Sequence, residues 1–168
     1  MTFSSKAEYG VRLMVELGRQ DGDLPMSLKA IAEAEDLPLS YLEHVVASLK
    51  RAGLVASSRG AHGGYRLARP AEEIAMDEVV LALEGSIAPM ECFTTAPPGK
   101  VACSHEGDAA STCSTKLLWM RVQMGIVGAL QGTTLAELVE FSRCGEPQVA
   151  TLPVAEGVTS LPVVQAGP

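Results

Sequence analysis

The chain has 168 residues, the length of one ordinary domain or of a small domain with an added element. Its hydrophobic content is 47% but its aromatic content only 4%, so aliphatic side chains must fill most of the core. The first residues lack the pattern of a secretory leader, and the most apolar run, 117–130, is too short to cross a bilayer. These features argue against a secreted or membrane protein, and we expect a cytoplasmic one, where thiols stay reduced.

The net charge of −7 is distributed unevenly along the chain. Residues 1–70 hold nine Lys or Arg and eight Asp or Glu, whereas residues 71–168 hold four and twelve. A chain with such different halves can bind a polyanion through its less acidic half. An acidic solvated surface would give the same totals, so charge alone leaves both interpretations open.

Two stretches near the N-terminus have the pattern of helices. Residues 7–20 carry apolar side chains on more than one side, which predicts a helix packed between neighbours. Ser27 is a suitable N-cap for a short helix that stops near residues 35–38.

A third helix is predicted after this break. Ser40 followed by Glu43 matches a capping box, and Gly53 suits the C-terminal cap. One face of this helix is apolar at helical spacing, with Leu42, Val45, Val46 and Leu49. Two short helices in succession, the second with a single apolar stripe, predict a helix-turn-helix.

Two strand-like runs follow, 54–58 and 65–69, and the glycines of segment 59–64 allow a tight turn between them. A hairpin directly after a recognition helix predicts a wing. The expected fold is therefore mainly α with a small β-hairpin wing, a winged helix-turn-helix domain. A helical hairpin packed on a β-ribbon, with no role in DNA binding, would show the same pattern.

The second half contains three predicted helices and a tail. Residues 71–86 predict one helix, and residues 133–141 predict another, capped by Thr134 and Glu137. Residues 115–132 predict a helix that is apolar over more than half its circumference. Such a helix is either buried in its own domain or paired with a copy of itself. We favour a homodimer, because the helices of the preceding domain are already paired with one another. Gly125 and Gly128 would permit close approach of two helices.

This pattern divides the chain into four parts. Residues 1–84 form the winged helix-turn-helix domain, and 85–116 form a cysteine-bearing loop. Residues 117–144 hold the long dimerisation helix and a short C-terminal helix. Residues 145–168, rich in Pro, Val and Gly, predict a flexible tail.

Three of the four cysteines, Cys92, Cys103 and Cys113, lie in a polar segment with almost no apolar residues. Free cysteines usually fill cores, so this placement indicates metal binding or redox chemistry. Soft thiolates hold iron–sulfur clusters. A structural zinc site, which usually needs closer cysteine pairs, and a reversible disulfide switch are the alternatives. Cys144 has no matching role.

Several of these stretches resemble the Rrf-two type of winged-helix transcription regulators, which includes IscR-like iron–sulfur regulators and NsrR-like nitric-oxide sensors. The resemblance covers residues 1–143 and is most specific in LSYLEHVVASLKRAGLV, in RGAHGGYRL and in the cysteines ahead of the long helix. It implies a homodimer that crosses its long helices and carries one iron–sulfur cluster (2Fe-2S or 4Fe-4S) per subunit. It also implies repression or activation of promoters according to cluster state.

We therefore expect a regulator that binds double-stranded DNA and is not an enzyme. The competing interpretation is a redox enzyme or cluster carrier that uses the same three cysteines. That interpretation lacks a visible active site and leaves the winged-helix features without a role.

The residues expected to contact DNA lie on the recognition helix and the wing. Residues at the start of a recognition helix face the major groove, and basic residues neutralise phosphates. The expected set is Ser40, Tyr41, Glu43, His44, Lys50, Arg51, Arg59, His62 and Arg66. Alternatively, Glu43 only completes the helix cap, and Lys50 and Arg51 form a solvated helix end.

Three cysteines leave one coordination position of a cluster open. IscR-like members have a histidine shortly after the third cysteine, where this chain has Lys116, a poor ligand. NsrR-like members use a carboxylate near the N-terminus, donated by the partner subunit, and the matching residue here is Glu8. His105 is a nearby alternative. Glu8 could instead be an exposed helix residue bonded to Arg12 one turn on.

Overall fold

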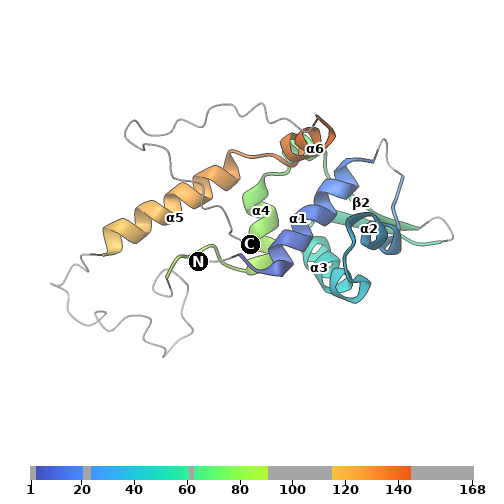
Figure 1. Ribbon diagram of the computed structural model, residues 1–168, viewed down its shortest axis with the longest axis horizontal. Helices are drawn as coiled ribbons and strands as arrows, with labels where there is room; N and C mark the ends of the chain where they lie inside the picture. Colours follow the sequence, from blue (N-terminus) through green and yellow to red (C-terminus); the bar gives the residue numbers. More distant parts are fainter. Residues whose placement is uncertain (1–2, 21–23, 61–62, 91–114, 145–168) are drawn as a thin grey trace, which may run out of the picture.

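Three N-terminal helices pack around one apolar core in the computed structural model (Figure 1). They are α1 (Ser5–Gly18), α2 (Leu28–Glu35) and α3 (Leu39–Arg51). The structure describes residues 3–20, 24–60, 63–90 and 115–144. The expected cysteine ligands Cys92, Cys103 and Cys113, His62, His105 and the tail lie outside these ranges.

The ends of these helices follow local sequence signals, with one correction. The Ser27 hydroxyl accepts a hydrogen bond from the Ala30 amide over 3.1 Å, as predicted for an N-cap. The capping box predicted at Ser40 is wrong, because the N-cap lies two residues earlier, at Pro38, and α3 begins at Leu39. The Pro38 carbonyl already accepts the amides of Tyr41 and Leu42, so Ser40 lies inside the first turn.

The predicted wing is confirmed as an antiparallel hairpin of β1 (Val55–Ser58) and β2 (Gly64–Leu67). Gly53 ends α3 with a φ of 75°, a conformation that glycine adopts without steric cost. Met26 and Tyr65 exchange two backbone hydrogen bonds of 2.8 Å, which tie the segment before α2 to the wing. A side chain at Gly64 would collide with the Met26 carbonyl.

The helix predicted over 71–86 is split into η1 (Ala71–Glu73) and α4 (Met76–Glu84). Ile74 and Ala75 are extended between them because this segment pairs with the chain that precedes α6. The Met76 amide donates to the Thr133 carbonyl, and the Leu135 amide donates to the Ile74 carbonyl. This pairing is non-local, so helical periodicity could not reveal it.

The long helix α5 (Lys116–Gln131) projects away from the other helices, whereas α6 (Leu135–Cys144) lies back over α1 (Figure 1). No residue of α5 is buried in this chain. The capping box of α6 is confirmed by two 3.3 Å hydrogen bonds between Thr134 and Glu137. Leu135 and Val139 belong to the core, so α6 packs with the winged helix-turn-helix unit.

No helix in the described ranges is long and apolar enough to span a membrane.

Candidate nucleic-acid interface

One face of α3 points outward because the other is fully used by the core. Leu42, Val45 and Leu49 are completely buried. Val46 is buried with them, and the side chains on the opposite face, Glu43, His44 and Ala47, are exposed to solvent. The predicted contact residues Ser40, Tyr41, Glu43 and His44 are all exposed. The structure thus brings the predicted major-groove residues together on one surface.

Tyr41 makes a contact within the chain, whereas Glu43 does not cap its helix. The Tyr41 ring lies edge-on to the Tyr9 ring of α1, with centroids 5.3 Å apart and planes at 78°. Aromatic pairs in this arrangement are attractive, so the contact supports the start of α3. α3 has no side-chain cap hydrogen bond, so the interpretation of Glu43 as a capping residue is wrong.

The C-terminal end of α3 is joined to the wing by Lys50. Its ammonium group donates to the Ser57 hydroxyl of β1 over 2.7 Å. Arg51 beside it is exposed. Two cations in the last turn also suit the negative end of the helix dipole. The sequence predicts the charge of Lys50 but not this partner, because the pairing depends on how the hairpin folds back.

The wing presents two further cations. Arg59 is exposed at the end of β1, next to Gly60, whose φ of 120° bends the chain into the turn. Arg66 is exposed on β2 opposite Ala56. Arg59 and Arg66 are therefore exposed like the outer face of α3, and exposed polar and basic residues of this type bind the major groove and its phosphates.

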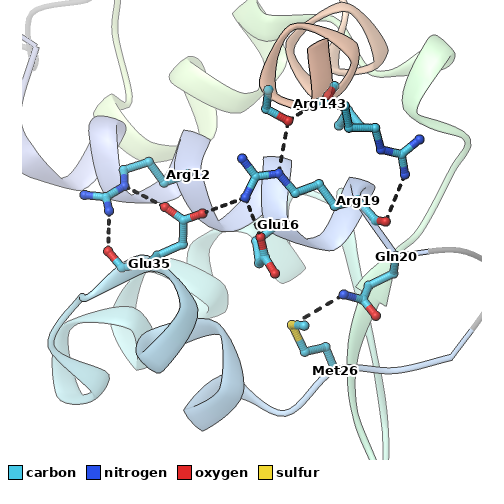
Figure 2. A network of polar contacts seen from close by, with 9 residues as sticks. Arg12, Glu16, Arg19, Gln20, Met26, Glu35 and Arg143 are labelled. Carbon is cyan, nitrogen blue, oxygen red and sulfur yellow. Dashed lines mark hydrogen bonds and ion pairs between the residues drawn. The ribbon is translucent and has the colours of Figure 1, made fainter. Parts of the chain in front are cut away.

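A second group of charged residues was not anticipated from the sequence (Figure 2). Arg12 bonds the carboxylate of Glu35 through Nε, over 2.9 Å, and the Glu35 carbonyl through Nη2. The expected alternative pairing of Arg12 with Glu8 is therefore wrong, and Glu8 is exposed on the first turn of α1. Arg19 extends the same group toward α6.

The start of α1 is fastened to the end of α4, from which the chain continues toward the cysteines. The Ser4 amide and hydroxyl donate to Glu84 Oε1 over 2.8 and 2.7 Å, and Lys6 Nζ donates to the Leu83 carbonyl. Within the described ranges no three His, Cys, Asp or Glu residues gather as a metal site. Lys116 is exposed at the start of α5, and the Cys144 thiol is exposed at the end of α6.

Comparison with known proteins identifies the family. Residues 3–141 match the Rrf2 family, described as an iron-dependent transcriptional regulator. The chain belongs to the Rrf2 family. It is 35% identical over 142 residues to the HTH-type transcriptional regulator CymR of Bacillus subtilis, covering 84% of this chain and 92% of the relative. It is 37% identical over 146 residues to IscR of Photobacterium profundum, covering 87% and 80%.

Solved structures of Rrf2 proteins have the same fold. The structure of B. subtilis CymR, called the global cysteine regulator, matches with a TM-score of 0.68 at 33% identity, covering 84% of this chain and 98% of CymR. The oxidized form of Staphylococcus aureus CymR matches with a TM-score of 0.63 at 36% identity, covering 83% and 97%. The winged-helix fold expected for an Rrf2 member is thus confirmed, and the chain is a DNA-binding transcription regulator and not an enzyme.

Proposed function

We propose that this Rrf2 regulator is a cytoplasmic homodimer that senses redox state, nitric oxide or iron–sulfur supply through an iron–sulfur cluster. Cys92, Cys103 and Cys113 are its proposed ligands. The observation that carries the proposal is this donor set, three thiols in a polar segment between α4 and α5. Thiolates are the usual ligands of iron–sulfur clusters. The iron-dependent description of the family and the similarity to IscR support the same interpretation.

The proposed DNA contacts follow from the exposed face of α3 and the wing. Ser40 and Tyr41 hydroxyls suit phosphate oxygens, and Glu43 suits the amine of a cytosine. Lys50 and Arg51 neutralise phosphates, while Arg59 reaches a base edge or a phosphate from the wing. His44, His62 and Arg66 complete the proposed set.

The proposed dimer rests on the exposure of α5. Leu117 and Met124 are 59% and 69% exposed, and Leu118, Met120 and Val122 are exposed as well. An apolar helix surface of this extent is unfavourable in water, and a second copy of the helix would cover it. A Cβ added at Gly125 or Gly128 would meet nothing within 4 Å in this chain, so both positions leave room for close approach of a partner helix.

Glu8 is the proposed fourth ligand, donated from the partner subunit. Its side chain is exposed, and Arg12 is bonded to Glu35 in its place. Carboxylate oxygen is a harder donor than thiolate, so this ligand should be displaced more easily. A bound cluster would supply iron and sulfide that react with nitric oxide and oxidants. His105 is the alternative ligand, whereas a lysine such as Lys116 is a poor ligand for iron.

A second candidate is a thiol/disulfide switch on the same cysteines. The similarity to CymR, called a global cysteine regulator, and to an S. aureus CymR solved in an oxidized form favours it. Exposed thiolates oxidise reversibly to disulfides, which would connect distant parts of the cysteine segment. A structural zinc ion is a third occupant of the same thiols.

The test measures operator affinity of the full chain in two states. An operator is first selected from random duplexes, and the anaerobically reconstituted chain is titrated against it before and after a nitric-oxide donor. We expect a change in affinity that Cys103→Ser abolishes and Cys144→Ser retains. If the cluster-free chain instead responds to diamide and recovers with dithiothreitol, the thiol switch replaces the cluster.

A further inference from the structure

Arg19 lies where α1, α2 and α6 meet (Figure 2). Its Nε donates to the Ser142 hydroxyl of α6 over 3.0 Å. Its Nη1 donates to Glu16 Oε2 over 2.8 Å and to Glu35 Oε1 of α2 over 3.3 Å. Its own carbonyl accepts a hydrogen bond of 2.9 Å from Nη2 of Arg143. One residue therefore has polar contacts with three helices.

The two carboxylates that Arg19 contacts are largely shielded from solvent. The side chains of Glu16 and Glu35 are only 11% and 13% exposed, whereas Arg19 is 37% exposed. Glu35 divides its carboxylate, with Oε1 bonded to Arg19 and Oε2 bonded to Arg12. The planar guanidinium group holds several acceptors in fixed directions, which a flexible ammonium group cannot do.

Glu35 of α2 and Ser142 of α6, which Arg19 contacts, lie in different parts of the fold. Glu35 is the last residue of α2, and Asp36, in the left-handed region with a φ of 51°, turns the chain toward α3. Ser142 lies in α6, which follows α5 after a short link. Arg19 therefore joins the turn of the helix-turn-helix to the helix that continues from the proposed dimer interface.

We propose that Arg19 is a positioning residue that fixes the helix-turn-helix relative to α6, and so sets the separation of the two recognition helices in the dimer. This inference rests on the proposed dimer but not on the proposed cluster. A dimer reads two half-sites at a defined separation. Its preference for that separation depends on how rigidly each helix-turn-helix is held to the dimer interface.

The experiment compares two operators and does not require a cluster. Affinity of the full chain is measured for the selected operator and for the same duplex with one base pair inserted between its half-sites. Arg19→Met removes every side-chain contact of Arg19, and Ser142→Ala removes only its contact with the Ser142 hydroxyl, so both leave the bond from Arg143 to the Arg19 carbonyl in place. Arg69→Met is the matched control. Arg69 is also 37% exposed and bonded to one carboxylate, that of Glu78, but the substitution leaves the Arg19–Ser142 contact in place.

We expect Arg19→Met and Ser142→Ala to reduce the preference for the native spacing by roughly fivefold, the loss expected from one charge-assisted hydrogen bond that is partly exposed. Ser142→Ala should add nothing in the Arg19→Met background, because both remove the same contact. Arg19→Lys should restore the preference only in part. Arg69→Met should lower affinity for both duplexes equally.

Three results would overturn the inference. The first is an unchanged spacing preference in folded, dimeric Ser142→Ala, the substitution expected to disturb folding least. The second is an equal loss of spacing preference in Arg69→Met, which would mean that loss of any positive charge lowers the preference. The third is full restoration by Arg19→Lys. A wild-type chain that sediments as a monomer would remove the dimer first, and this inference with it.

Discussion

The Lys50 ammonium group donates to the Ser57 hydroxyl over 2.7 Å, and this bond connects the last turn of α3 to the first strand of the wing. Both side chains are exposed, so the bond contributes little to the free energy of unfolding. Its consequence is positional, because it keeps a cation at the junction between the recognition helix and the wing, where both elements would approach a phosphate backbone.

Lys50→Ala should weaken binding to operator and non-operator duplexes alike, because a phosphate contact carries no sequence information. The slope of log K against log salt should fall by about one unit. Ser57→Ala keeps the charge and serves as the control, with an unchanged slope. Titrations at two salt concentrations measure both, and a loss confined to the operator would contradict a phosphate role for Lys50.

Arg59→Ala should weaken operator binding by about 1–3 kcal/mol if its guanidinium group contacts a base edge. Arg59 is exposed beside the turn of the wing, so its loss should leave the fold intact. Arg66→Ala, on the second strand of the same hairpin, is the comparison for a nearby cation. Equal affinity of wild type and Arg59→Ala for the operator would remove the wing from the interface.

Gly64→Ala should lower the free energy of unfolding by about 1–3 kcal/mol, the usual cost of forcing extra atoms into a packed site. The new methyl group would collide with the Met26 carbonyl, which is backbone and cannot rotate away. Gly53→Ala is a useful contrast, because its methyl group would meet no atom and its cost is purely conformational. Chemical denaturation measures the free energy of unfolding of both variants. A Gly64→Ala variant as stable as the wild type would mean that the paired Met26 and Tyr65 segments move apart at little cost.

Met124→Glu should dissociate the proposed dimer and abolish tight operator binding. Met124 is 69% exposed in the single chain, so the substitution leaves the fold of each subunit intact. A charge at the centre of an apolar interface must be desolvated on association, which is costly. Arg121→Glu, on the same exposed helix, is the control for charge alone. Sedimentation that finds the wild type as a monomer at micromolar concentration would refute the dimer.

The sequence predicted the parts of this fold that depend on local patterns. The apolar stripe of α3, the Ser27 cap and the capping box of α6 all involve residues within a few positions of one another. One error arose from a competing local signal and the other from a distant segment. Pro38 displaced the cap expected at Ser40, and pairing with the segment before α6 split the helix predicted over 71–86.

Some features of the candidate site could also be predicted from local sequence, whereas others depend on distant residues. Exposure of Ser40, Tyr41 and Glu43 could be predicted because burial of the opposite face requires it. The partner of Arg12 could not, since Glu35 is 23 residues away and is brought close by the packing of α2 on α1. Arg19 has contacts across 123 residues, which no periodicity in the sequence records.

The most direct test of cluster binding is the iron and acid-labile sulfide content of the full chain, purified without oxygen. With a bound cluster, the wild type and Cys144→Ala should contain iron and sulfide in equal amounts and absorb visible light. Cys103→Ala should lose both, and Glu8→Ala should retain the cluster but lose it sooner in air than the wild type. Zinc without sulfide, or a chain without metal that forms a reversible disulfide among Cys92, Cys103 and Cys113, would contradict the cluster.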